Sequence, residues 1–168
     1  MGIRTAFLLI FVICLVSACE QAQKEAAAPQ HRHEIQEETL SKADIKAKLE
    51  SEGYQLFEYV DDTSGDTMIM QQYFIAFLKN GPDRSQTKEA ADSLQILHLN
   101  HLSLMYELGH ADISGPFGDE GEIRGITVYN TPTFEMADSL ANADPMVKAG
   151  RLVIELHPWW AAKGFALR

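Results

Sequence analysis

The chain has 168 residues, of which 46% are hydrophobic and 23% are charged, so it is long enough for one globular domain with a buried core. Its formal net charge at pH 7 is −10. This excludes nucleic acid as an expected partner, because affinity for nucleic acid rests on neutralising phosphates with lysine and arginine.

The first residues have the three-part pattern of a secretory signal. Residues 1–4 supply positive charge, and the apolar run at 6–16 is shorter than the roughly 20 residues of a spanning helix. Residues 16–19 (VSAC) resemble the lipobox of bacterial lipoproteins, which implies that residues 1–18 are removed and that Cys19 is lipidated. Two alternatives remain: a plain signal peptide with an incidental Cys19, or an uncleaved membrane anchor.

Cys14 would leave with the signal, so the mature domain would have no free thiol for a disulfide, a metal site or a nucleophile. The sequence has no polybasic segment, so the lipid is expected to provide the membrane anchor. Glu20 differs from the aspartate associated with inner-membrane retention, which favours the outer membrane, facing the periplasm.

Residues 19–38 are rich in Ala, Gln, Glu and His and are expected to form a flexible tether. His31 and His33 flank Arg32 in this tether; we favour an incidental pair in a solvated tail over a metal site. Residues 39–52 then carry Leu40, Ile45 and Leu49 among Lys and Glu, which predicts a short amphipathic helix ended by Gly53.

Two strands are expected at residues 54–60 and 67–78, joined by a polar turn at 61–66. Both faces of the second strand are apolar, so it is expected to be a central strand that is covered on each side. Tyr73, Ile75 and Phe77 point to one face, and Phe74, Ala76 and Leu78 point to the other.

After a turn at residues 80–83 (NGPD), Ser85 or Thr87 is expected to cap a long helix that ends at Leu108, before Gly109. The helix has an expected buried stripe of Leu94, Leu97, Leu102, Met105 and Leu108.

Strands at 113–117 and 123–130 are expected to flank an acidic turn, and Thr133 to cap a second helix through residue 142. Asp144-Pro145 should end this helix, and Gly150 should reverse the chain into a strand that closes at a bend at residues 157–160 (HPWW). The fold class is therefore α+β, with a ferredoxin-like βαββαβ core preceded by an extra helix and strand. Two helices cover only one sheet face, so we expect a homodimer to cover the other.

Four segments follow one another at close spacing: 73–85 (YFIAFLKNGPDRS), 98–117 (HLNHLSLMYELGHADISGPF), 118–125 (GDEGEIRG) and 143–160 (ADPMVKAGRLVIELHPWW). Together they resemble the YciI-like (YCII-related) family of the dimeric α+β barrel superfamily. The likeness covers residues 70 to about 164. We divide the chain into the signal (1–18), the tether (19–38), an N-terminal extension (39–67) and a YciI-like domain (68–164).

The resemblance implies an active-site pair formed by a helix histidine and the aspartate of Asp-Pro. His98 stands eleven residues before Gly109 and seventeen before Gly115, which is the family's spacing, so we assign the pair to His98 and Asp144. A histidine exchanges protons near neutral pH, and an adjacent carboxylate fixes its tautomer. The pair is suited to a lyase-, isomerase- or hydrolase-type proton transfer on a small molecule, without a cofactor. The alternative is an ordinary helix histidine and a helix-stopping aspartate.

Six further residues are candidates for contact with a substrate: His101, Arg84, Arg124, Phe117, His157 and Trp159. The two arginines would meet an anionic group; the alternative for each is a surface salt bridge, which contributes about 0–1 kcal/mol. Backbone N–H groups at residues 115–118 are candidates for stabilising an oxyanion. Trp159 and Trp160 are more commonly packing residues than a stacking platform.

The sequence has no P-loop, dinucleotide-binding fingerprint or zinc-ligand arrangement, and its acidic turn lacks the ligand spacing of a calcium loop. Neither a cofactor nor a metal is therefore expected. The competing hypothesis is a non-catalytic binding or structural lipoprotein. An apolar cleft with His98 and Asp144 more than about 6 Å apart would favour that hypothesis.

Overall fold

The computed structural model describes residues 40–164. The predicted signal, the lipidated Cys19 and the tether lie outside the described residues. No helix among residues 40–164 is long and apolar enough to cross a membrane.

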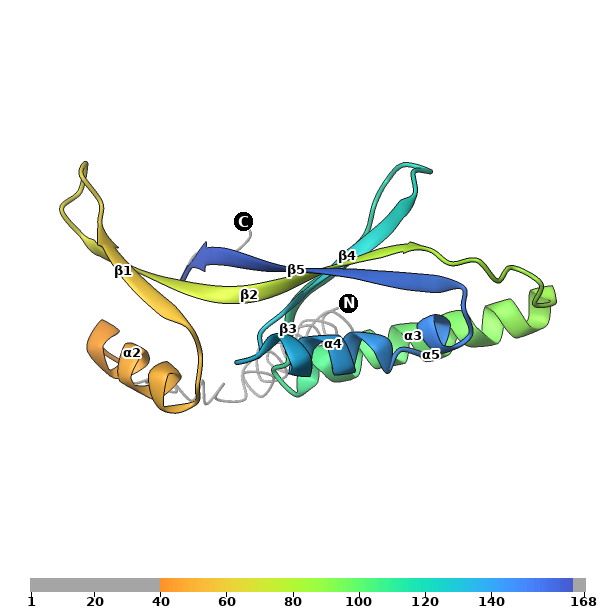
Figure 1. The fold of residues 1–168 in the computed structure, drawn as a ribbon, viewed down its shortest axis with the longest axis horizontal. Helices are drawn as coiled ribbons and strands as arrows, with labels where there is room; N and C mark the ends of the chain where they lie inside the picture. Colours follow the sequence, from red (N-terminus) through yellow and green to blue (C-terminus); the bar gives the residue numbers. More distant parts are fainter. Residues whose placement is uncertain (1–39, 165–168) are drawn as a thin grey trace, which may run out of the picture. The chain divides into compact units, whose positions relative to one another are not determined.

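A five-stranded antiparallel sheet lies at the centre of this part of the chain (Figure 1). Its longest strand, β2 (Thr67–Asn80), pairs along one edge with β5 (Leu152–Ala162). On the other edge it pairs with β1 (Leu56–Val60) at its start and with β4 (Ile123–Tyr129) further along. Strand β3 (Ala111–Pro116) pairs with β4. The core strand order is thus β5-β2-β4-β3, in which β2 is the central strand, as predicted.

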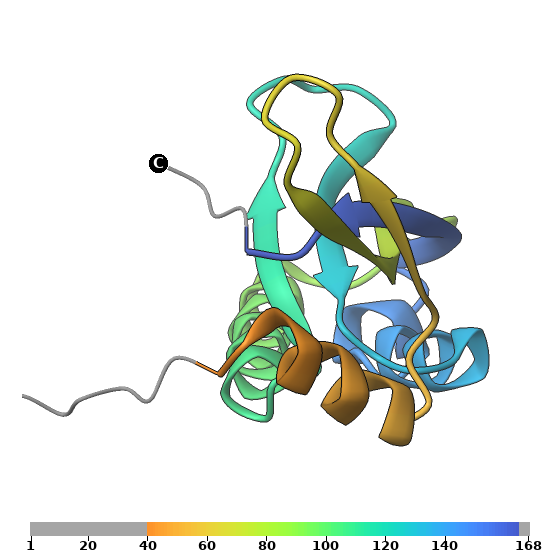
Figure 2. The ribbon, with the colours of Figure 1, turned by 90° about the vertical axis from the view of Figure 1, so that its left-hand side faces the viewer.

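Helices cover one face of this core sheet, as Figures 1 and 2 show. They are α3 (Lys88–Glu107), α4 (Phe134–Asn142) and the short α5 (Pro145–Lys148); α2 (Lys42–Ser51) precedes β1. The element order β2-α3-β3-β4-α4-β5, with α5 between α4 and β5, and the strand order together are the ferredoxin-like arrangement. The predicted α+β fold class, with an extra N-terminal helix and strand, is confirmed.

The hydrophobic core lies between the sheet and these helices. Phe74, Ala76 and Leu78 face it from β2, and Met105 contributes from α3. On the opposite face of β2, Tyr73 is buried, whereas Ile75 and Phe77 are only partly buried. We call this side the outer face of the sheet.

The long helix α3 begins at the second of the two predicted caps. The Thr87 hydroxyl accepts a hydrogen bond from the Ala90 N–H, whereas Ser85 bonds to Asp83. The predicted buried stripe is partly wrong, because Leu97 and Leu108 are 49% and 56% exposed. His98 is buried on α3 instead, together with Met105. Positions 94, 98 and 105 recur at helical spacing, and Leu97 lies about 100° around the helix from His98.

The last strand is longer than predicted, since β5 continues through the expected bend to Ala162 and pairs Trp160 with Gln72. Pro158 is tolerated opposite Phe74 because β5 is an edge strand, whose outer edge needs no N–H donor. At the other end, Asp144-Pro145 ends α4 as predicted and also starts the unpredicted α5. In α2, only Leu49 is buried, and Leu40 lies exposed before the helix.

Candidate active site

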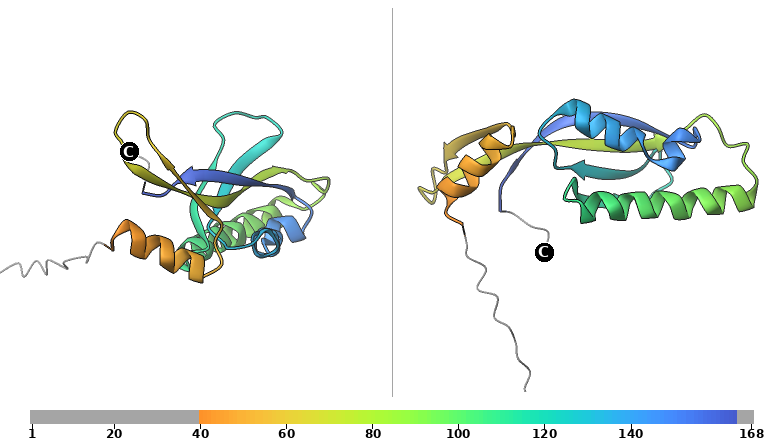
Figure 3. Two further views of the ribbon diagram at one scale, coloured as in Figure 1. Left: turned by 60° about the vertical axis from the view of Figure 1, so that its left-hand side comes forward. Right: turned by 90° about the horizontal axis from the view of Figure 1, so that it is seen from below.

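The two residues assigned to the active-site pair are in contact. His98 lies on α3 and Asp144 lies directly before α5, and the two elements pack together (Figure 3). His98 Nδ1 is 2.6 Å from Asp144 Oδ2. The two residues are only 8% and 3% exposed, so this polar contact is shielded from bulk water.

The local sequence explains how Asp144 is oriented. Asp144 is the N-cap of α5, and its Oδ1 accepts a hydrogen bond from the Met146 N–H at 2.8 Å. Pro145 occupies the first helical position, where its fixed backbone angle suits the helix and its missing N–H costs nothing. One carboxylate oxygen is therefore held by the backbone, and the other is directed at His98.

This geometry favours one form of the histidine. With Nδ1 against the carboxylate, the neutral ring carries its proton on Nδ1 and leaves Nε2 as the available nitrogen. The His98–Asp144 pair is thus arranged to accept a proton at Nε2 while Asp144 stabilises the resulting cation.

Tyr129 is a further titratable group that the charge of Asp144 affects. Burial, followed by the charge of Asp144, raises the pKa of Tyr129 well above its ordinary value, so the Tyr129 phenol stays neutral.

A cavity of about 430 Å³ opens beside His98, within the size range of small-molecule sites. It lies on the helix-covered side of the sheet, between α3 and the ends of β2 to β5. Its polar lining residues come from five different segments: Arg84, Gln95, His98, Ser114, Arg124 and Arg151. Most of the remaining lining is apolar or glycine. No group of three metal-ligating side chains occurs in residues 40–164.

Three of the sequence-predicted residues lie at this cavity, namely His98, Arg84 and Arg124. Neither arginine forms an ion pair within the described residues, so the salt-bridge alternative does not account for them.

No family model matches the chain, and neither does any protein among the curated proteins. The solved structures that are similar to it include 5-chloro-2-hydroxyhydroquinone dehydrochlorinase from Burkholderia phenoliruptrix, in complex with 2,5-dihydroxybenzoquinone. The two chains are 17% identical with a TM-score of 0.41, and the match covers 52% of this chain and 92% of the other.

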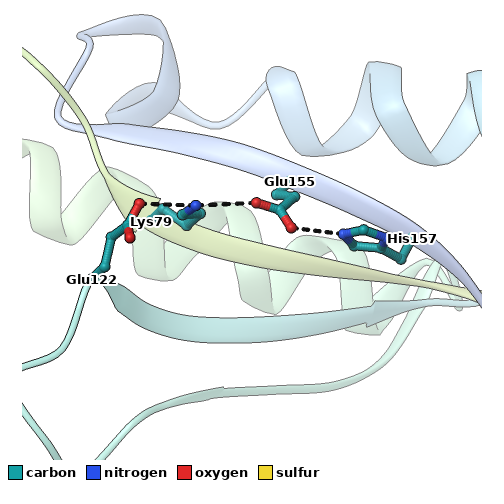
Figure 4. Close-up of polar contacts among 4 residues, drawn as sticks. All are labelled: Lys79, Glu122, Glu155 and His157. Carbon is teal, nitrogen blue, oxygen red and sulfur yellow. Dashed lines mark hydrogen bonds and ion pairs between the residues drawn. The ribbon is translucent and has the colours of Figure 1, made fainter.

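Four of the six candidates for substrate contact do not line the cavity. His157 and Trp159 lie on the outer face of the sheet, because they pair with Ile75 and Tyr73. His157 Nε2 is 2.8 Å from Glu155 Oε1, at the end of the chain of polar contacts in Figure 4. His101, one turn beyond His98, is partly buried, and no hydrogen-bond partner of its Nε2 lies within the described residues.

Phe117 is 43% exposed and follows β3 outside the cavity lining. Its N–H donates to the Arg124 carbonyl at 3.0 Å, and Pro116 has no N–H. These two positions therefore offer no free donor for an oxyanion, and the sequence-based expectation for residues 115–118 is wrong for Pro116 and Phe117.

Sequence reasoning missed Arg151. This residue starts the reversal into β5, where its carbonyl accepts the Gly81 N–H at 2.9 Å, and its Nη1 donates to Gln86 Oε1 at 2.8 Å. The sequence did contain a signal for Arg151, because this residue follows Gly150, where the chain was expected to reverse into the last strand. Since β5 runs antiparallel to β2, the start of β5 lies beside the end of β2. Arg84 follows that end of β2, just before the long helix, so Arg151 and Arg84 lie at the same end of the sheet.

Proposed function

We propose that the chain is a small-molecule enzyme that transfers a proton by general acid–base catalysis and needs no cofactor. His98 is the acid or base and Asp144 its orienting partner. The observation that carries the proposal is the buried 2.6 Å contact between them at the wall of a cavity of suitable size. The resemblance of the surrounding motifs to the YciI-like family supports the same pair.

The proposed step begins with neutral His98, whose Nδ1–H donates a hydrogen bond to the Asp144 carboxylate and whose unprotonated Nε2 is presented to the cavity. Nε2 takes a proton from the substrate, and the electron pair of the broken bond stays on the substrate. The imidazolium is stabilised by the Asp144 carboxylate and returns the proton to a different atom or to a leaving group. This sequence accounts for an isomerase-type or a lyase-type reaction without another reactant, and for a hydrolase-type reaction with water.

The alternative, a non-catalytic binding protein, was expected to show His98 and Asp144 more than about 6 Å apart. The 2.6 Å separation of His98 Nδ1 and Asp144 Oδ2 favours the catalytic proposal over it.

The test is a proton-exchange screen in deuterium oxide that assumes no particular reaction. Carbonyl acids, phenols and lactones are incubated with the domain from Leu40 onward, and deuterium entry into carbon positions is followed by NMR. The proposal expects at least one compound to be labelled by the wild type and not by His98→Gln. Equal labelling by both proteins would overturn it.

We also propose that a second copy of the chain covers the outer face of the sheet. This face carries three exposed apolar side chains, Ile113, Val153 and Trp159, beside the partly buried Ile75 and Phe77. It also carries both charge signs: Lys79 Nζ is 2.9 Å from Glu122 Oε1 and 3.1 Å from Glu155 Oε2 (Figure 4). A face with apolar rows and both charges suits pairing with its own copy about a twofold axis.

Trp159→Arg is expected to shift the protein from dimer to monomer, because the new charge would be buried without a partner in the interface. Sedimentation equilibrium measures the change. The matched control is Tyr106→Arg, which alters a 69% exposed aromatic on α3 and should leave the dimer intact. A wild-type protein that is monomeric at high concentration refutes the proposal directly.

We further propose that the chain is lipidated at Cys19 and held at the outer membrane, facing the periplasm. The support is the lipobox-like sequence before Cys19 and the glutamate that follows it. In a Gram-negative host, Cys19→Ala should prevent radiolabelled palmitate incorporation and membrane retention of the processed protein. Unchanged labelling of the variant would contradict the assignment.

A further inference from the structure

Three arginines converge on the cavity beside His98. Residues 40–164 contain only Arg84, Arg124 and Arg151, and all three line this one cavity. No aspartate or glutamate lines it, although the chain has 24 acidic residues against 14 basic ones. The cavity is thus a local cationic region in an acidic protein.

The arginines are bound by neutral groups rather than by carboxylates. Arg84 donates to the side-chain oxygen of Asn80, Arg124 to two backbone carbonyls, and Arg151 to Gln86. By contrast, Lys46, Lys79 and Lys88 each lie within 4.0 Å of an acidic side chain. Neutral partners orient a guanidinium without neutralising it, so its charge remains available to a ligand.

Of the three arginines, Arg151 gives the strongest indication of a bound ligand. Its Nε is buried, and no acceptor for it lies within the described residues. Asp83 is near enough for Arg151 to help lower the pKa of that carboxyl, but the hydrogen bonds from Ser85 are the main cause. A buried donor without an acceptor is uncommon in folded proteins and indicates a missing partner such as a bound anion or water.

The rest of the lining restricts the body of the ligand. Leu99 and Leu102 come from α3, and Met146 and Leu152 from the segment that follows Asp144. Walls of this kind favour a compact apolar group, and the volume of about 430 Å³ holds one ring or a short branched chain.

We infer that the cavity binds a small organic anion, a carboxylate or phenolate on a compact apolar body, with Arg151 as its principal anchor. The inference rests on the proposed function, because it gives the substrate class of the same site. The anchored anion places a neighbouring C–H bond before His98 Nε2. For a substrate of this class that also carries a ketone or ester carbonyl next to that carbon, the proton moves to Nε2 and the electron pair of the C–H bond forms the C=C bond of an enolate. The arginines stabilise the enolate oxygen that forms.

The test compares matched pairs of charged and neutral probes, benzoate with benzamide and cinnamate with cinnamamide. Binding to the domain from Leu40 onward is measured by NMR titration at constant ionic strength, with the arginine Nε–H resonances as reporters. Benzoate or cinnamate should bind more tightly than its amide and shift the Arg151 Nε–H signal. Arg151→Gln should raise the Kd of the anion about 10- to 100-fold, as expected for a hydrogen bond to a charged group.

The control variant is Lys88→Gln, which removes the same charge at an 81% exposed side chain paired with Asp92 and should leave the Kd unchanged. Arg151→Lys keeps the charge but loses the planar fork, so it should recover only part of the affinity. Equal binding of anion and amide, no saturable binding of either anion, or an Arg151→Gln variant with wild-type Kd would each overturn the inference.

The two proposals fail in different ways. If anions bind through Arg151 but no compound undergoes exchange that depends on His98, the anion site stands and the catalytic proposal falls. If His98-dependent exchange occurs only with neutral compounds and Arg151→Gln leaves it unchanged, catalysis stands and the anion site falls.

Discussion

Replacing His98 by glutamine is expected to lower the rate of substrate proton exchange about 100- to 10,000-fold, the usual contribution of a general acid or base. Glutamine keeps a polar amide near Asp144, so the buried carboxylate retains a potential hydrogen-bond donor, but it cannot take up a proton at neutral pH. The rate is measured by deuterium entry into the compound found in the screen. Circular dichroism of the variant checks that the fold is retained.

The matched control is His101→Gln, one helical turn further along α3 and outside the cavity lining. It should keep the exchange rate within a few-fold of wild type. Asp144→Asn should preserve the start of α5, since asparagine is also a good N-cap, while lowering the rate because an amide no longer stabilises the imidazolium. A His98→Gln variant that exchanges at the wild-type rate would remove His98 from the mechanism.

The order of the elements was predictable from two kinds of signal. Both faces of β2 are apolar, which marks a central strand, and Thr87 and Thr133 mark the starts of two helices while Gly109 marks the end of the first. The buried stripe of α3 was predicted only in part: Met105 is buried, but Leu97 and Leu108 are exposed, and His98 was not counted as a core residue. His98 is accommodated there because Asp144 supplies the polar contact that burial would otherwise remove.

The candidate site was less predictable. His98 and Asp144 are 46 residues apart, and no rule of periodicity links them, so only the resemblance to a family paired them. Arg151 was missed because its approach to Arg84 depends on the register between β5 and β2. The choice of His157 as a substrate-contact candidate could have been avoided. Alternate residues of a strand face opposite sides of the sheet, so His157 lies on the same side as Val153 and Glu155 and on the opposite side from the core-facing Leu156.

Gly81→Ala is expected to destabilise the domain by about 3 kcal/mol or more, the upper end of the usual cost of overpacking. A Cβ at this position would lie 2.1 Å from the Gly150 carbonyl oxygen and 2.6 Å from the Arg151 carbonyl carbon. Both atoms belong to backbone, so no side-chain rotation relieves the overlap. The end of β2 would have to separate from the start of β5, which breaks the hydrogen bond from the Gly81 N–H to the Arg151 carbonyl.

Urea unfolding measures this loss against Gly118→Ala, where an added Cβ meets nothing within 4 Å and the glycine has no positive φ. The control should change the free energy of unfolding by less than about 1 kcal/mol. Since small domains are stable by only about 5–15 kcal/mol, a 3 kcal/mol loss is readily resolved. Equal stability of the two variants would show that the two segments are not in the close contact described. If Gly81→Ala remains folded without urea, it should also bind benzoate more weakly, because the displaced backbone carries Arg151.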